Sequence, residues 1–156
     1  MSWKETDPIE RPSPCGGRHA RLEPRDTVTW GPGKAEWRFT FYRLVLDGRR
    51  VEGDFTQDLV WEDRGRWLAA VLCLNAVAGN DFWNYAPADW KPQQALVVVD
   101  PQGPSAGRAA FDPACFYKPL KFESEAIVYE KTKHFAVGPV WEMEVAIDAI
   151  TDWRPL

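Results

Sequence analysis

The chain has 156 residues, of which 45% are hydrophobic and 27% are charged, the balance of one soluble globular domain. Its formal net charge of −4 argues against a nucleic-acid partner, because affinity for phosphate requires a basic face. The three cysteines, Cys15, Cys73 and Cys115, are an odd number at wide spacings, which fits neither a disulfide framework nor a zinc site. With only two histidines and no phosphate-binding motif, we expect no metal and no cofactor.

The sequence also indicates where the protein resides. Residues 1–8 contain no apolar run typical of a signal peptide. The longest apolar stretch, 67–74, is too short to cross a bilayer, so we expect no membrane partner. These observations predict a cytoplasmic protein with reduced cysteines.

Prolines, among them Pro12 and Pro24, are frequent in the first segment, residues 1–26. Each proline fixes φ and removes a backbone hydrogen-bond donor. The segment is therefore predicted to be an extended, irregular arm without a long helix or strand. Residues 27–156 are predicted to form a single β-rich domain.

Alternating side chains predict strands from residue 27 onward. A short strand over 27–30 precedes a longer one with a period of two. On that longer strand one face bears Trp37, Phe39, Phe41 and Val45.

Two turn signals follow. Asp47-Gly48 is a strong two-residue hairpin signal, and it predicts that residues 49–55 return as the partner strand. A polar turn with a glycine then separates two apolar runs, which predicts a second hairpin between Trp61 and Trp67. The apolar run over 66–78 fits a buried strand or a buried helix, and the hairpins before it favour the strand.

The second half of the chain continues the β pattern. Residues 95–100 are a continuous apolar run, which predicts a strand buried on both faces. Residues 116–123 and 126–133 are predicted to pair as a hairpin. The last strand has an apolar face with Trp141, Met143, Val145 and Ile147, and an acidic face with Glu142, Glu144 and Asp148. Together these segments predict an all-β fold, either an antiparallel β-sandwich or a barrel-like sheet.

One hairpin resembles a known repeat. Residues 59–70, Leu-Val-Trp-Glu-Asp-Arg-Gly-Arg-Trp-Leu-Ala-Ala, followed by 95–100, look like one blade of a β-propeller. The sequence departs from that repeat at Glu62 and Asp63, where the repeat has Ser-Pro, and it contains no second copy. The resemblance therefore implies a local strand-turn-strand geometry and not a propeller.

Residues 103–107 match the Gly-x-Ser-x-Gly elbow of serine hydrolases. Ser105 would be the nucleophile, with Asp112 and His134 following in the order of that enzyme class. The surrounding prolines, however, leave no room for the helix that must follow such an elbow. Loops commonly contain these residue types, so the motif is expected to be a turn.

A thiol nucleophile is the second catalytic candidate. Cys15 lies four residues before His19, and Cys115 lies nineteen residues before His134, so each has a possible base. Cys73 lies in an apolar run and is expected in the core. We expect Cys115 to be buried and Cys15 to be an ordinary loop residue.

Features typical of partner binding are more prominent. Loop 80–92 combines rings and carboxylates: Asp81, Trp83, Tyr85, Asp89 and Trp90. This loop either presents its rings to a partner or folds back to complete the core. Likewise, the acidic face of the last strand either meets a basic partner or is a solvated face that blocks edge pairing. Of the nine tryptophans, we expect most in the core and two or three exposed.

A compact, acidic domain without a catalytic motif is expected to act by binding. In size, charge and lack of catalytic motif the chain is similar to small bacterial immunity proteins, which neutralise a toxin by covering its active site. This resemblance implies a non-catalytic protein-binding domain whose partner has a basic surface. The alternatives are a small hydrolase using Ser105 or a cysteine, and a small-ligand binder with a tryptophan-lined cleft.

Overall fold

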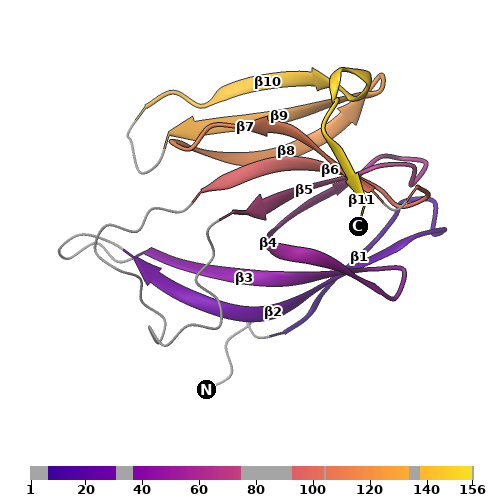
Figure 1. Cartoon of the computed structure of the whole chain (residues 1–156), viewed down its shortest axis with the longest axis horizontal. Helices are drawn as coiled ribbons and strands as arrows, with labels where there is room; N and C mark the ends of the chain where they lie inside the picture. Colours follow the sequence, from indigo (N-terminus) through magenta and orange to yellow (C-terminus); the bar gives the residue numbers. More distant parts are fainter. Residues whose placement is uncertain (1–6, 31–36, 75–92, 104, 134–137, 156) are drawn as a thin grey trace.

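The computed structural model describes residues 7–30, 37–74, 93–103, 105–133 and 138–155, with the backbone alone at 26–30 and 37–39. The described chain is all-β, as predicted, and every strand pairing in it is antiparallel (Figure 1).

The strands are β1 (Ile9–Pro12), β2 (His19–Trp30), β3 (Trp37–Leu46), β4 (Arg49–Trp61), β5 (Leu68–Cys73), β6 (Gln94–Asp100), β7 (Ser105–Phe111), β8 (Cys115–Glu123), β9 (Ala126–Lys133), β10 (Trp141–Ala146) and β11 (Trp153–Pro155). A short 3-10 helix, η2 (Ile147–Ala149), follows β10. No helix within the described ranges has the length and apolar character needed to span a membrane.

The strands form two sheets. The larger has eight strands in the order β1-β2-β3-β4-β5-β6-β7-β11, and the smaller has three in the order β10-β9-β8. Among the described residues the end strands of the larger sheet, β1 and β11, do not pair with each other, so the sheet is not closed into a barrel. Of the two predicted architectures, stacked sheets are the one that forms.

Strand β4 bends and so belongs to both halves of the large sheet. The first half contains β1, β2 and β3, and the second contains β5, β6, β7 and β11. The pairing of β4 with β5 shifts register between Phe55 and Leu59, and Gly53 before this shift has φ 122°. The indole N–H of Trp61 donates to the Arg11 carbonyl at 2.7 Å, so the end of β4 returns to the edge strand β1. The bend thereby folds the first half of the sheet toward the second.

The first core lies between these two halves. Side chains from β2, β3 and the first part of β4 meet those from the end of β4, from β5 and from β6. Its buried residues are Ala20, Leu22, Tyr42, Leu44, Leu46, Val51, Phe55, Trp61, Leu68, Ala70, Ala95, Val97 and Val99. Each large aliphatic side chain buried in this way stabilises the fold by about 1.5–3 kcal/mol.

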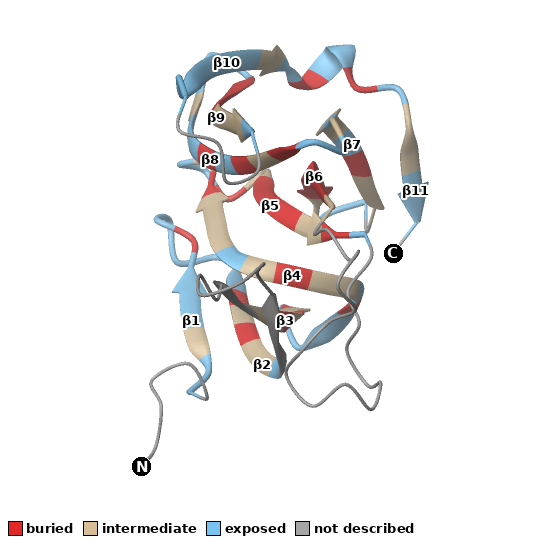
Figure 2. Cartoon of the chain, turned by 90° about the vertical axis from the view of Figure 1, so that its left-hand side faces the viewer, coloured by how far each residue is buried: buried red, intermediate tan, exposed pale blue. Residues whose placement is uncertain are grey.

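A second core lies on the other face of β5 and β6, beneath the three-stranded sheet (Figure 2). Ala69, Val71, Leu96 and Val98 point to this side and pack against β8 and β9. Both faces of the two central strands are therefore covered, which explains their continuous apolar sequences. The strand preferred within 66–78 is confirmed over β5, and the doubly buried strand predicted at 95–100 is confirmed as β6.

The predicted hairpin turns are confirmed. Asp47 and Gly48 have φ of 50° and 81°, and Ser124 and Glu125 have φ of 51° and 61°. Positive φ at both central residues is the type I′ geometry, whose twist matches that of the flanking strands. The turn at 62–67 joins β4 to β5, and β6 pairs alongside β5, which is the strand-turn-strand arrangement expected there.

The predicted irregular arm is wrong over the residues that the structure describes. Residues 9–12 form β1, and residues 19–26 belong to β2. Pro12 is the last residue of an edge strand, and Pro24 lies where the pairing of β2 with β3 shifts register. An edge and a bulge tolerate a missing N–H, so these prolines do not prevent strand formation.

The face of β3 on which the sequence shows its period of two is not the face that enters the first core. Phe41 is buried and Val45 is half-buried, whereas side chains 37–39 lie outside the described set. The opposite face of β3 is the one that enters the first core, through Tyr42, Leu44 and Leu46. Both faces carry apolar side chains, so the period of two could not identify the inner one.

The last predicted strand ends earlier than expected. The chain leaves the ladder after Ala146 because the Ile147 side chain is buried and its N–H donates to the Glu125 carbonyl at 2.9 Å. Asp148 therefore lies in η2 and does not share a strand face with Glu142 and Glu144. The acidic face predicted for this strand is wrong at Asp148.

Candidate binding surfaces

The turns after β1, β3, β4, β6, β8 and β10 gather at one end of the molecule, on the right in Figure 1. Polar contacts join these turns. The thiol of Cys15, after β1, donates to the carbonyl of Arg64, after β4, at 3.3 Å. Arg66 pairs with Asp100 at the start of the turn after β6. We call this region the turn end, and two of its hollows adjoin each other.

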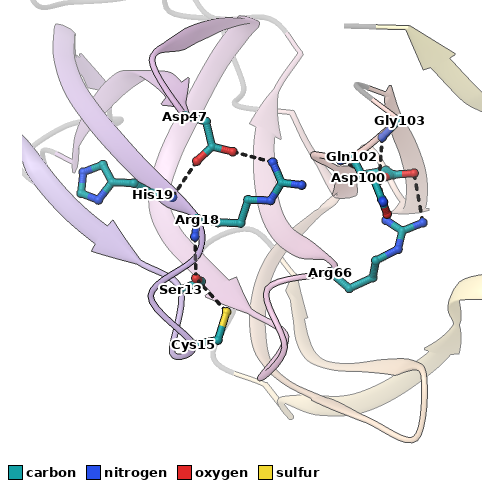
Figure 3. Close-up of polar contacts among 9 residues, drawn as sticks. All are labelled: Ser13, Cys15, Arg18, His19, Asp47, Arg66, Asp100, Gln102 and Gly103. Carbon is teal, nitrogen blue, oxygen red and sulfur yellow. Dashed lines mark hydrogen bonds and ion pairs between the residues drawn. The ribbon is translucent and has the colours of Figure 1, made fainter.

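The first, the arginine hollow, has a volume of about 500 Å³ and is lined in part by Arg18, Arg64 and Arg66. Each guanidinium already has a carboxylate partner. Arg18 pairs with Asp47 at 2.8 Å, and Arg66 pairs with Asp100 (Figure 3). Arg64 pairs with Glu62 at 2.8 Å. The hollow is thus rich in arginine but close to neutral in charge.

These carboxylates are held ionised by their surroundings. Burial alone would raise the pKa of Asp100, yet the Arg66 guanidinium and the N–H groups of Gly103 and Gln102 lower it below its ordinary value. Burial is likewise outweighed at Asp47, where Arg18 and the His19 N–H lower the pKa. Arginine therefore serves at this end to fix the turns against one another.

The second hollow, the tryptophan cleft, has a volume of about 530 Å³. Its walls include Trp67 and Trp153, whose ring centroids lie 5.8 Å apart at an interplanar angle of 43°. The indole N–H of Trp153 donates to the Ile150 carbonyl at 2.9 Å, which fixes the orientation of that ring. Trp67 lines both hollows, and the Arg66 guanidinium lies 4.0 Å from its ring centroid.

Three carboxylates line the tryptophan cleft: Asp100, Glu125 and Asp148. Asp100 is neutralised by Arg66, whereas Glu125 and Asp148 form no ion pair with any residue that the structure describes. The hydrogen bond from the Ile147 N–H to the Glu125 carbonyl holds η2 beside the β8–β9 turn, so both carboxylates lie on one rim. The cleft combines aromatic walls with an excess of negative charge.

A third surface is strand β10. Within the described residues it pairs with β9 alone, and its side chains are largely exposed. Trp141 and Met143 are 38% and 40% exposed. They lie on the same face of β10 as Val145, which packs against the second core. Glu142 and Glu144 lie on the other face, where Glu142 is directly opposite Glu130 of β9.

The predicted serine hydrolase elbow does not form. Ser105 begins β7 and pairs with Asp100 across a β6–β7 hairpin, so a strand follows it and not a helix. Asp112 lies beyond the other end of β7, which is about 20 Å away along a strand of this length. His134 lies outside the described residues.

The cysteines have the environments that the sequence predicted. Cys73 and Cys115 are buried, and burial raises the pKa of Cys73 to about 12. Cys15 is exposed in the turn after β1, where the Ser13 hydroxyl lowers its pKa. Its predicted base is engaged elsewhere, because the ring of His19 contacts Glu10.

The predicted partner-binding residues are divided between several places. Glu142 and Glu144 share β10, and Asp148 lies in the tryptophan cleft. The loop residues Asp81, Trp83, Tyr85, Asp89 and Trp90 lie outside the described set. Among the tryptophans with described side chains, Trp61 is buried, Trp67 and Trp153 are half-buried, and Trp141 is exposed.

Sequence reasoning missed the pairing of Trp67 with Trp153 and the role of Glu125 on the cleft rim. The sequence places Trp67 in a hairpin and Glu125 in a turn, with no sign that they meet. No local pattern could have joined these residues, since two come from different turns and Trp153 begins β11, and only the stacking of the two sheets brings them together.

Comparisons of the chain with protein-family models, with curated proteins and with solved structures found no match. The function must therefore be argued from the surfaces themselves.

Proposed function

We propose that this chain is a non-catalytic protein-binding domain, and that strand β10 pairs with an extended, basic segment of its partner. The observation that carries the proposal is the outer edge of β10, which no other described strand covers, with carboxylates on one face and exposed apolar side chains on the other. Addition of a strand to an exposed sheet edge is a common mode of peptide recognition, in which main-chain bonds give affinity and side chains give specificity.

The charges on the outer face of the small sheet favour a basic partner. Lys118 of β8, Glu130 of β9 and Glu142 of β10 lie opposite one another in a cross-strand row. The row places Glu142 beside Glu130, and like charges directly opposite are destabilising. A lysine or arginine on an added strand would lie on the other side of Glu142 and relieve this repulsion.

The same charges disfavour pairing with a second copy of the chain. If two β10 strands paired antiparallel with their faces matched, Glu142 and Glu144 of one would lie opposite carboxylates of the other. A shift of one residue would avoid this, but it would place glutamates on the face of Trp141 and Met143. A different chain with alternating basic and apolar side chains satisfies both faces.

The apolar face distinguishes this edge from one that is only protected by charge. Charged residues on an edge strand commonly serve to prevent aggregation. Such protection requires no exposed ring, whereas Trp141 and Met143 offer the aromatic and thioether groups that are enriched at protein interfaces. Repulsion of self and attraction of a basic partner are compatible uses of the same glutamates.

In its narrower form, the proposal makes the partner a toxin whose active site the domain covers. Its support is the likeness in size, charge and lack of catalytic motif to small bacterial immunity proteins. Complementary charge would give fast association, and burial of Trp141 would slow release. An acidic inhibitor of this kind needs no catalytic group of its own.

The test is affinity capture of a partner from native cells, followed by binding measurements on the purified pair. Charge reversal at two positions, Glu142→Lys and Glu144→Lys, is expected to weaken the complex at least about tenfold at low salt. Glu52→Lys is the matched control, because Glu52 is an exposed carboxylate on β4. Unchanged affinity of the double variant would contradict the proposal, and a partner that keeps full activity in the complex would contradict its toxin form.

A further inference from the structure

We propose that the tryptophan cleft binds an organic cation, an ammonium or guanidinium group carried on a short aliphatic chain. The cleft is built by the turn after β4, the turns after β6 and β8, and the segment from η2 to β11. This site is separate from the β10 edge, and the inference does not depend on strand pairing there.

The aromatic walls suit a cation. The face of an indole ring attracts ammonium and guanidinium groups through its quadrupole. Trp67 already holds one such group, since the Arg66 guanidinium lies 4.0 Å from its ring centroid. Arg66 lines the arginine hollow but not the tryptophan cleft, so this internal cation does not fill the proposed site.

The second wall is held in place before any ligand arrives. Trp153 is fixed through its N–H bond to the Ile150 carbonyl and by close packing against Gly107. A methyl group at position 107 would lie 2.9 Å from Cδ2 of that indole. A wall that is already ordered spares a ligand the entropy of ordering it.

The charge of the cleft selects the sign of the ligand. No lysine or arginine is among its described lining residues, and Glu125 and Asp148 form no ion pair with a described residue. Glu125 also borders the arginine hollow, where Arg64 attracts it from beyond ion-pair distance, so Asp148 is the carboxylate without a cationic neighbour in either hollow. An anion would be repelled by this rim. A neutral ligand such as a sugar would gain hydrogen bonds to the carboxylates but no attraction between opposite charges, whereas a cation gains from both the rings and the charges.

The size of the cleft also fits. Its volume of about 530 Å³ lies within the range of small-ligand pockets, about 300–1,000 Å³. The same cationic chemistry could be presented by a free metabolite or by a lysine or arginine side chain of a protein. In either case the positive group would contact the two indole rings on one side and the carboxylates of the rim on the other.

The first experiment compares choline with 3,3-dimethylbutan-1-ol, which has the same shape without the charge. Each compound is titrated into the purified full chain and followed by calorimetry. Choline is expected to bind at least about tenfold more tightly than the alcohol. Titration with the amides of acetyl-trimethyllysine and acetyl-arginine then distinguishes the sources, since a protein ligand predicts tighter binding of these two than of choline.

Variants locate the site. Asp148→Asn and Glu125→Gln are each expected to weaken choline binding by about threefold to tenfold, and Trp153→Phe by a similar factor. Glu52→Gln is the matched carboxylate control and should bind as the parent does. The Glu142→Lys, Glu144→Lys double variant should also bind choline normally, which separates this inference from the proposed function. Equal binding of the alcohol, or choline binding that neither Asp148→Asn nor Glu125→Gln weakens, would overturn it.

Discussion

At the residue scale, the tryptophan cleft depends on one glycine. A methyl group at position 107 would lie 2.6 Å from Cγ2 of Ile150 and 2.9 Å from Cδ2 of Trp153, both far inside contact distance. Neither neighbour has room to retreat, because the indole is anchored by its hydrogen bond and Ile150 is buried in the second core. The absence of a side chain at Gly107 therefore sets the position of the wall.

Gly107→Ala is expected to lower the free energy of unfolding by about 1–3 kcal/mol, the usual effect of overpacking. Urea unfolding followed by circular dichroism measures this change. Gly138→Ala is the control, because a methyl group at position 138 would meet nothing within 4 Å. Equal stability of the two variants would show that the packing around Gly107 is looser than described.

Thiol reactivity provides a second test at this scale. Cys15 is exposed with a lowered pKa, while Cys73 and Cys115 are buried with raised pKa values. In the native protein at pH 8, a disulfide reagent should modify Cys15 rapidly and the other two only after unfolding. Mass spectrometry of the digested product identifies the labelled position. Rapid labelling of Cys73 would contradict the burial of β5.

At the scale of the element, β4 is the strand on which the architecture depends. Its bend allows a single long strand to serve both halves of the large sheet. The bend also brings Asp58 into a half-buried position, where its N–H bonds the Thr56 hydroxyl at 3.2 Å. Burial raises the pKa of the Asp58 carboxyl, and the charge of Lys118 and the Thr56 hydroxyl oppose this effect only in part.

Asp58→Asn is therefore expected to raise the melting temperature at pH 7. A carboxyl whose folded pKa is raised favours folding when it is protonated, so its charge destabilises the native state as pH rises through that pKa. The gain should shrink near pH 3, where Asp58 is protonated in the parent chain as well. Thermal unfolding of both proteins at the two pH values tests this. A variant less stable than the parent at pH 7 would contradict it.

Elements also show how far the sequence could predict this fold. The turn at Asp47-Gly48 was predictable because these two adjacent residues favour its geometry. The turn at Ser124-Glu125 was predictable only from the strand patterns on either side of it, because serine and glutamate do not favour positive φ. The strand β1 was not, since an edge position tolerates Pro12 only once β2 lies beside it. The end of β10 was not predictable either, because it depends on contacts with residues distant in sequence. The Ile147 N–H donates to the Glu125 carbonyl and the Ile147 side chain is buried, so the chain leaves its pairing with β9 at this point.

At the scale of the whole molecule, one of the two candidate surfaces follows from a local sequence pattern and the other depends on contacts between distant residues. The acidic face of β10 follows from alternation along one strand, so Glu142 and Glu144 could be proposed as binding residues from the sequence. The tryptophan cleft requires two sheets to stack and four separate segments of the chain to meet, which no local pattern encodes. Asp148 lies on the rim of the cleft because it belongs to η2, whereas the sequence placed it on the acidic face of the last strand.

Ion pairs across the turn end should make the stability of the whole domain sensitive to acid. The pKa values of Asp47, Glu62 and Asp100 are lowered in the fold, so their contribution is complete above the ordinary carboxyl value of about 4 and is lost as pH falls through the folded values. Urea midpoints should therefore drop below about pH 4. Arg66→Gln should make this drop smaller by removing the partner of Asp100. A drop of unchanged size would contradict the assignment.

The proposed mode of action is strand addition at the outer edge of β10, which no other described strand covers. Hydrogen exchange of the full chain, with and without an extended peptide of alternating lysine and valine, tests it most directly. If β10 binds an added strand, its amides should exchange more slowly when the peptide is present, and no such change should occur in the Glu142→Lys, Glu144→Lys variant. Protection confined to other strands, or equal protection in the charge-reversed variant, would rule out this mode of binding.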